Sequence, residues 1–508
     1  MLLLSLIPAS VMAQGNKPLN IIYIMTDDHA QQTMSCYDGS LNQTPGLDRL
    51  AKEGVLFENS FVTNSISGPS RAVLITGKFS HLNGFRDNAS TFDGSQQTFP
   101  KLLQKAGYQT AIIGKWHLVS QPTGFDYWTI LPGQGSYYNP DFITANGKEK
   151  VEGYVTNIIT DKSIDWIEHR DKSKPFCLLL HHKAIHRNWM ADTTDLLAYE
   201  DVTFREPATF WDGYKNRKAA AYQQQSIDKD MDLTYDLKML HDSIHTPIGT
   251  WYGEITRMNG SQRAAWDRHY VPLTEQFLHD SLSGRELVQW KFQRYLRDYL
   301  KCVKSVDDNT ARLYAYLEKE GLLENTIIVY ASDQGFYMGE HGWFDKRFIY
   351  EESLRTPLLV RMPNSMDVPR GVRVKQMVQN IDYAPTLLTL AGVEVPSDMQ
   401  GCSLDAILRG QKVKTWRDAI YYHYYEYPDA HRVHRHYGVR TDRYKLAHFY
   451  GSDINSWELF DLRTDPHEVN NVYGTAKYKN IQAQLHQRLT DLQAQYGDTE
   501  PEANYKDE

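Results

Sequence analysis

The chain has 508 residues, 41% hydrophobic and 23% charged, with a formal net charge of −8. This composition is typical of a globular protein and excludes a disordered, collagen-like or coiled-coil chain. The acidic net charge argues against a nucleic-acid partner. No apolar run reaches the roughly 18 residues of a membrane span, so no membrane span is predicted.

The N-terminal residues 1–13, MLLLSLIPASVMA, have the pattern of an export signal. A short apolar stretch precedes Val11 and Ala13, which occupy the −3 and −1 positions of a small-residue cleavage site. This resembles a secretory signal peptide, although it lacks a basic start; the alternative is a disordered apolar N-terminus. The pattern predicts a periplasmic or secreted protein. The four cysteines show no CxxC spacing, which argues against a zinc ribbon or a thioredoxin-type site.

The region 17–411 is predicted to alternate strands and helices. Near-continuous apolar runs, as in buried parallel strands, lie at 20–25, 110–113, 176–180 and 326–330. Helix signals lie at 45–54, 100–107, 156–168, 306–321 and 382–392. Repeated β-α units predict an α/β fold, a large doubly wound and mostly parallel sheet with helices on both faces.

Two regions depart from this alternation. Residues 187–301 are rich in charge, Trp and Tyr, and we expect a long insertion over one edge of the sheet. It is either a packing appendage or a substrate wall. Residues 412–508 are predicted to form a smaller α+β subdomain. Its predicted antiparallel strands and helix lie at 420–427, 437–440, 444–449, 457–462 and 481–492.

Charged and polar side chains follow four of the predicted parallel strands. They are Asp27, Asp28, Lys115, His117, His181, His182, His186, Asp333 and Gln334. Ligands of an open α/β sheet bind beyond the carboxyl ends of its strands. Together these residues are hard to explain as structure, because clustered charge is costly without a metal or an anion to bind.

The chemistry of these side chains divides into two groups. Asp27, Asp28, Asp333 and Gln334 offer oxygen ligands, which favour calcium or magnesium over zinc. The cations Arg71, Lys115 and Lys346 suit an oxyanion such as sulfate or phosphate. A metal beside an anion pocket predicts hydrolysis at sulfur or phosphorus.

A candidate nucleophile lies in Ser67-Gly68-Pro69-Ser70-Arg71. Pro69 suits the first turn of a helix, which would place Ser67 at the N-terminus, where free N–H groups and the helix dipole favour an anion. The alternative is that Ser67 only caps the helix.

This pentapeptide, followed by Thr76-Gly77, resembles the signature of the formylglycine-dependent type I sulfatases of the alkaline phosphatase superfamily. Further blocks of the chain resemble that family in the same order: 20–28, 114–118, 332–346 and 458–466. The resemblance covers essentially the whole mature chain and implies the same α/β fold.

The resemblance implies covalent catalysis at residue 67. Ser67 would be oxidised to formylglycine by a maturing enzyme, and one hydroxyl of the hydrated aldehyde would attack sulfur. The second hydroxyl would then expel sulfate. The serine form of the motif is similar to that matured by anaerobic radical enzymes of bacteria, which fits export to a periplasm.

The resemblance also implies a role for each site residue. Asp27, Asp28, Asp333 and Gln334, with residue 67, would bind Ca²⁺; Lys115 and Lys346 would grip sulfate; Arg71 would hold the nucleophile; His186 would protonate the leaving oxygen; His117 would assist collapse of the sulfo-enzyme. Gln334 stands where Asn or His is more frequent, which lengthens the ligand arm.

The segment 423–445 bears on the substrate. Its basic residues are Arg432, Arg435, Arg440, Arg443 and Lys445. They form either a solvated strand face or a basic rim for a sulfated glycan. This segment and 339–347 resemble N-acetylglucosamine-6-sulfatases, which implies a 6-O-sulfated N-acetylglucosamine of glycosaminoglycan or mucin glycans. Asp345, Arg347 and His436 are the expected sugar-binding residues.

Two other functions stay open at this point. A phosphomonoester or phosphonate hydrolase of the same superfamily would usually carry an unmodified nucleophile and two metals. A non-catalytic protein that binds sulfated glycans would keep Ser67 as serine. The single set of oxygen ligands and Pro-Ser-Arg after Ser67 favour the sulfatase.

Overall fold

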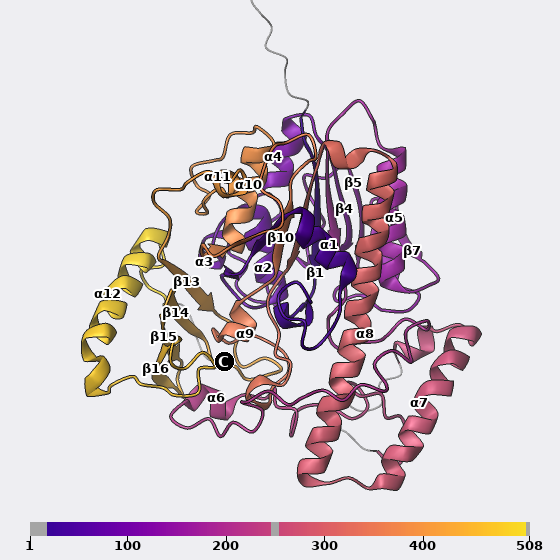
Figure 1. The fold of residues 1–508 in the computed structure, drawn as a ribbon, viewed down its shortest axis with the longest axis vertical. Helices are drawn as coiled ribbons and strands as arrows, with labels where there is room; N and C mark the ends of the chain where they lie inside the picture. The colour runs from indigo at the N-terminus through magenta and orange to yellow at the C-terminus, as the bar shows by residue number, and fades with distance from the viewer. Residues whose placement is uncertain (1–17, 245–252, 504–508) are drawn as a thin grey trace, which may run out of the picture.

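The computed structural model describes residues 18–244 and 253–503 (Figure 1). The predicted signal peptide, residues 1–13, lies outside these ranges. Within them, the search for a helix long and apolar enough to cross a membrane finds none.

A ten-stranded sheet forms the centre, in the order β11-β2-β10-β9-β1-β8-β4-β5-β6-β7. Its strands are β1 (Asn20–Thr26), β2 (Val55–Phe57), β4 (Gln109–Lys115), β5 (Tyr127–Leu131), β6 (Asp141–Thr144), β7 (Gly147–Lys150), β8 (Phe176–His181), β9 (Thr326–Ser332), β10 (Leu358–Arg361) and β11 (Val372–Val374). The five strands from β9 to β5 run parallel. The predicted α/β fold is therefore confirmed.

Helices cover both faces of this sheet (Figure 1). One face carries α1 (Pro45–Glu53), α5 (Val155–His169) and α8 (Gly284–Lys319); the other carries α2 (Ser67–Thr76), α4 (Phe99–Lys105) and α10 (Tyr383–Leu390). Along β1, Ile22 and Ile24 join the first core, whereas Ile21 and Tyr23 join the second. Burial of both faces explains why the strand is a continuous apolar run.

The edges of the sheet differ from the predicted parallel pattern. β10 pairs antiparallel with both of its neighbours, and β6 and β7 form an antiparallel hairpin at the far edge. All four residues of β7 are exposed, so the sequence carried no hydrophobic signal for it.

The region 187–301 is mostly irregular, with α6 (Lys218–Tyr222) and α7 (Gly260–Asp280) below the sheet in Figure 1. Its last part is the first half of α8, which continues without a break past residue 301. The C-terminal limit predicted for the insertion therefore falls inside a helix.

A separate four-stranded antiparallel sheet follows, as predicted. It consists of β13 (Ala419–Tyr424), β14 (His436–Thr441), β15 (Tyr444–Tyr450) and β16 (Asn455–Asp461), covered by α12 (Lys479–Tyr496). Leu485, Leu489 and Leu492 of α12 are buried against this sheet. The smaller elements are β3 (Ser60–Phe61), β12 (Val378–Gln379), α3 (Ser80–Asn83), α9 (Glu351–Leu354) and α11 (Asp405–Leu408).

Candidate active site

The parallel strands bring the predicted oxygen ligands to one place. Thr26 at the end of β1 lies opposite Ser332 at the end of β9. Asp27 and Asp28 follow β1 and Asp333 follows β9, so these three residues are neighbours. The backbone N–H of Asp28 donates a hydrogen bond of 3.1 Å to Asp333 Oδ1. All three carboxylates are fully buried.

Gln334 completes this set. Its amide nitrogen contacts the Asp28 carboxylate and lies 3.3 Å from Ser67 Oγ. Its amide oxygen is buried and has no hydrogen-bond partner in the described part of the chain. Because the two ends of an amide have the same shape, a turned side chain would present this oxygen to the carboxylates. The longer arm of glutamine therefore reaches the site.

The acidic residues fit a bound cation. Burial, together with the neighbouring carboxylates, raises the pKa of Asp28 to about 7, even though Lys346 lowers it. Burial and Asp27 likewise raise the pKa of Asp333 to about 6. Ligand atoms of Asp27, Asp28 and His186 also lie within 4.8 Å of one another. Such a buried and mainly oxygen donor set suits a hard divalent ion, which would favour the ionised carboxylates.

Ser67 lies against this cluster as the first residue of α2, with Ile66 at the capping position. Its hydroxyl donates a 3.0 Å hydrogen bond to Asp27 Oδ1. A side chain on Gly68 would come within 2.6 Å of the Phe85 ring, so glycine lets the helix begin this close to its surroundings. The reading of Ser67 as a mere cap is wrong, because its side chain faces the carboxylates.

Arg71 acts on the cluster from one turn further along α2. Its Nε and Nη2 donate to Asp333 Oδ2 at 3.0 and 2.9 Å, and Nη1 donates to the Lys115 carbonyl. These hydrogen bonds hold Asp333 and the end of β4. They position the surroundings of Ser67, whereas the sequence had predicted that Arg71 holds the nucleophile itself.

Each predicted sulfate lysine faces one aspartate. Lys115 Nζ contacts the Asp27 carboxylate, and Lys346 Nζ lies 2.8 Å from Asp28 Oδ2. Burial lowers the pKa of Lys115 to about 8, although Asp27 opposes this shift. Lys115 also donates to Gln134 Oε1 at 2.5 Å. The sequence analysis missed Gln134, which follows β5 and carries the same signal of a polar side chain after a strand.

The surroundings of the two predicted acid–base histidines favour their neutral form. Burial, followed by the charge of Lys115, holds the pKa of both His117 and His186 well below the usual value. Nδ1 of His186 is bonded to the Arg187 carbonyl at 2.6 Å, which leaves Nε2 as its second polar atom. His181 instead lies with Nδ1 3.1 Å from the Lys115 carbonyl, as a histidine that packs against the end of β4.

The predicted sugar-binding residues Asp345 and Arg347 form a buried network that the C-terminal subdomain completes. Arg347 Nε lies 3.1 Å from Asp345 Oδ1, and Arg347 Nη1 lies 2.7 Å from Glu426 Oε1. His431 Nε2 lies 3.3 Å from Asp345 Oδ2. The sequence analysis missed Glu426 and the role of His431, because only tertiary packing brings them to this loop.

His436 lies elsewhere. It is fully buried between aromatic rings in the C-terminal sheet. Its Nε2 accepts a hydrogen bond from the Ile349 N–H, and its Nδ1 lies 2.8 Å from the His434 carbonyl. Both ring nitrogens are therefore used by the main chain, and we correct its prediction as a sugar ligand.

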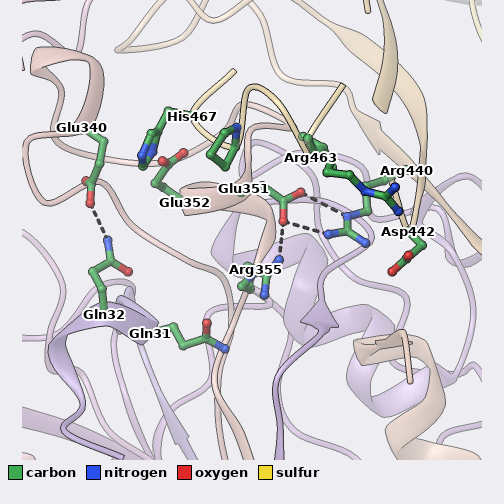
Figure 2. Close-up of a pocket in the computed structure, with 12 residues that line it drawn as sticks. Gln31, Gln32, Glu340, Glu351, Glu352, Arg355, Arg440, Asp442, Arg463 and His467 are labelled. Carbon is green, nitrogen blue, oxygen red and sulfur yellow. Dashed lines mark hydrogen bonds and ion pairs between the residues drawn. The ribbon is translucent and has the colours of Figure 1, made fainter. Parts of the chain in front are cut away.

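The predicted basic rim is largely internal. Arg440 is 6% exposed and Lys445 is fully buried. Figure 2 shows Arg440 and Arg355 converging on Glu351, and Lys445 Nζ lies 2.9 Å from the same carboxylate. Arg440 and Lys445 are therefore neither on a solvated face nor on a rim for a glycan, because they form ion pairs with Glu351 that join the two parts of the protein.

Comparison with known sequences agrees with this geometry. The chain matches the family described as sulfatase over residues 19–393 and the C-terminal family of N-sulphoglucosamine sulphohydrolase over residues 339–495. It is 52% identical to an N-acetylglucosamine-6-O-sulfatase of Bacteroides thetaiotaomicron, over 97% of this chain and 89% of that protein. It is 27% identical to human N-acetylglucosamine-6-sulfatase, over 81% of this chain and 68% of that protein.

Comparison with solved structures points the same way. The structure of BT4656 in complex with its substrate D-glucosamine-2-N,6-O-disulfate has a TM-score of 0.93 and 51% identity, covering 96% of this chain and 100% of that one. A phosphonate monoester hydrolase of Agrobacterium radiobacter shares the fold alone, with a TM-score of 0.67 and 20% identity over 94% of this chain and 96% of that one. From its sequence matches and its site, the chain belongs to the sulfatase family.

Proposed function

We propose that this protein removes the 6-O-sulfate from an N-acetylglucosamine or related glucosamine residue of a glycan. The observation that carries the proposal is a buried cluster of three aspartates, one glutamine and two lysines at the start of α2, in which Asp27 and Gln334 contact Ser67. The names of the relatives support the substrate, since the bacterial and human relatives are N-acetylglucosamine 6-sulfatases.

We further propose that Ser67 is converted to formylglycine by a maturing enzyme and that Ca²⁺ is held by Asp27, Asp28, Asp333 and Gln334. When present, the hydrated aldehyde supplies the oxygen that attacks sulfur, and the ion stabilises negative charge on the sulfate oxygens. The donor set supports calcium because it is mainly oxygen and rigidly buried. The serine in the signature supports bacterial maturation and a periplasmic or secreted location.

The residues of the chain would divide the remaining work. Asp27 accepts the hydrogen bond of the residue 67 side chain and so orients it. Lys115 and Lys346 are paired with Asp27 and Asp28, and their ammonium groups would bind sulfate oxygens when a cation neutralises these carboxylates.

Proton transfer to the leaving sugar oxygen falls to the histidines. His186 lies among the metal ligands, with Nδ1 fixed by the main chain. A neutral His186 must first take up a proton, and the negative charge of bound sulfate would raise its pKa. His117, which is partly buried and close enough to feel the charge of Lys115, would serve the release of sulfate from residue 67.

The test combines two measurements on one sample. Sulfate release from N-acetylglucosamine-6-sulfate is measured by ion chromatography, and the Ser67 peptide is examined by mass spectrometry for the loss of two hydrogens. Turnover with formylglycine supports the whole proposal. A confirmed formylglycine without turnover would reject N-acetylglucosamine-6-sulfate as the substrate. Turnover with unmodified serine would reject formylglycine as the nucleophile.

A further inference from the structure

A cleft outside the catalytic pocket lies in the region 187–301. It has a volume of about 400 Å³ and is lined by residues 210–212, 214, 221–224, 226 and 228–230, together with Val288 and Gly342. A second hollow of about 430 Å³ shares Trp211 and Asp212 with it. Both volumes lie in the range of small-molecule sites. Trp211 therefore stands between two adjoining hollows, which together could accept an extended ligand.

Exposed aromatic rings gather at this cleft. In the described ranges, the large aromatic residues with high exposure are Tyr127 at 38%, Trp211 at 40% and Tyr222 at 66%. Two of these three line the cleft. Exposed aromatic surface gathered in a hollow is a mark of binding, because an isolated domain gains nothing from leaving it in water.

The ring of Trp211 is held in place. Its Nε1 donates a 2.8 Å hydrogen bond to Glu206, and the Arg285 guanidinium lies 3.9 Å from the ring centroid. A bound ligand would therefore meet a pre-oriented platform, with little loss of side-chain entropy on binding.

Polar groups of the cleft suit hydroxyl groups. Asp230 is fixed by two hydrogen bonds from Ser226, of 2.8 and 2.7 Å, and the glutamines 223 and 224 add amide groups. A sugar ring has apolar C–H faces and a rim of hydroxyls, so it matches aromatic platforms edged by amides and carboxylates.

The charged side chains of the two hollows restrict which class of sugar can bind. Asp228 and Asp230 line the first hollow with Lys229, Asp465 lines the second, and Arg285 lies on the Trp211 ring that both share, so that acidic side chains outnumber basic ones. The carboxylate of Asp212 is already neutralised by Arg217 at 2.6 Å. Sulfated sugars and uronic acids would face this acidic surface at a cost.

We propose that this cleft is a second carbohydrate-binding site, which holds uncharged sugar residues of a glycan. It rests on the proposed function only for the choice of a carbohydrate as ligand. The segment between cleft and catalytic pocket is firmly anchored: Gln224 N–H donates to the His431 carbonyl at 2.7 Å, and Phe344 N–H donates to the Gln225 carbonyl at 3.0 Å. None of the proposed catalytic residues lines the cleft.

The experiment measures binding by titration calorimetry on the full chain. The probes are an unsulfated N-acetyllactosamine tetrasaccharide and a sulfated heparin tetrasaccharide. Trp211→Ala and Tyr222→Ala are each expected to weaken binding of the unsulfated probe about tenfold, which is the loss of one ring contact. Tyr222→Phe keeps the ring and should bind as the wild type does. Tyr127→Ala removes an exposed ring elsewhere and is the matched control.

Binding of the unsulfated probe that Trp211→Ala and Tyr222→Ala leave unchanged would overturn the proposal, as would absence of binding to the wild type. Stronger binding of the heparin probe with the same ring dependence would overturn the preference for uncharged sugars. Should Trp211→Ala fail to fold, Tyr222→Ala decides, because that side chain is mostly in solvent. Sulfate release from the monosaccharide is measured in parallel, so failure of the proposed function is seen separately.

Discussion

The protein contains two buried clusters of charge that look alike in the sequence and differ in the structure. Around Glu351, one carboxylate meets Arg355, Arg440 and Lys445, and these cations hold its pKa well below the usual value despite burial. Around Ser67, the pKa values of Asp28 and Asp333 stay raised, even though Lys346 and Arg71 lie beside them.

This difference in carboxylate pKa distinguishes a cluster of structural ion pairs from a candidate catalytic site. The Glu351 carboxylate is balanced by three cations of the chain and joins α9 to β14 and β15. Lys445 also pairs with Glu468 at 2.6 Å, a carboxyl whose pKa burial raises to about 7.

Two of the three carboxylates at Ser67, Asp28 and Asp333, still favour protons, which a divalent cation would replace. Lys115 holds the pKa of the third, Asp27, well below its usual value despite burial. A count of charged residues does not distinguish the two; the position of each partner does.

Removal of the nucleophile is the largest expected effect on activity. Ser67→Ala should lower kcat by at least about 10⁴-fold, because no oxygen remains to attack sulfur. Sulfate release from N-acetylglucosamine-6-sulfate measures it. Ser65→Ala is the matched control, since its hydroxyl binds the Ser353 carbonyl instead of the carboxylates. Residual turnover of Ser67→Ala within tenfold of the wild type would contradict the assignment.

If the proposed Ca²⁺ is bound, its chelation should abolish turnover and lower the melting temperature by several degrees. Without metal, the folded pKa values of about 7 for Asp28 and about 6 for Asp333 exceed the unfolded value near 3.8. The folded state then binds more protons, so its stability falls as pH rises from about 4 to about 7. Added Ca²⁺ should therefore raise Tm more at about pH 8 than at about pH 5, where protons compete for the carboxylates.

Differential scanning fluorimetry with and without Ca²⁺ at both pH values checks this expectation. Asp333→Asn is the control, which should lose most of the response to Ca²⁺. An equal shift in Tm at the two pH values would argue against a metal bound by these carboxylates.

Substitution of the proposed sugar-binding residues Asp345 and Arg347 should lower activity on some substrates more than on others. Asp345→Ala and Arg347→Ala should lower kcat/KM on N-acetylglucosamine-6-sulfate by about 100-fold, and much less on a small aryl sulfate, which lacks the sugar hydroxyls. Arg347→Lys keeps a positive charge beside Glu426 and is the control for losses of activity that come from misfolding. Equal losses on both substrates would show that these residues support the reaction centre and do not select the sugar.

The smallest effect on catalysis is expected in the Glu351 cluster. Arg440→Ala should lower the free energy of unfolding by about 3 kcal/mol, because it removes a partner from a buried carboxylate. The kcat of the folded protein should stay within about twofold, since no contact of Arg440 reaches Ser67 among the hydrogen bonds described. Chemical denaturation and sulfate release measure both.

Arg373→Ala is the matched control for this change. Arg373 is half exposed and pairs with Glu58, so its loss should cost less than about 1 kcal/mol. A fall in kcat for Arg440→Ala without a loss of stability would assign Arg440 to the catalytic machinery.

The sequence by itself determined the architecture and the reaction centre. Continuous apolar runs in β1, β8 and β9 show strands buried on both faces, and the polar residues directly after them must meet at one edge of a parallel sheet. Pro69 fixed the start of α2 and thereby the place of Ser67. These signals are local or follow from strand direction, which explains why they can be read without coordinates.

Only the tertiary structure decided which distant charges compensate one another. Lys445 and Arg440 belong to a basic stretch by sequence, yet Glu351 from the catalytic part neutralises them. His431 and Glu426 reach the Asp345–Arg347 loop from the connection between β13 and β14, whereas His436 is turned into the core. Such pairings form only when the two subdomains pack together. They join residues far apart in the chain, and no periodicity or spacing in the sequence predicts them.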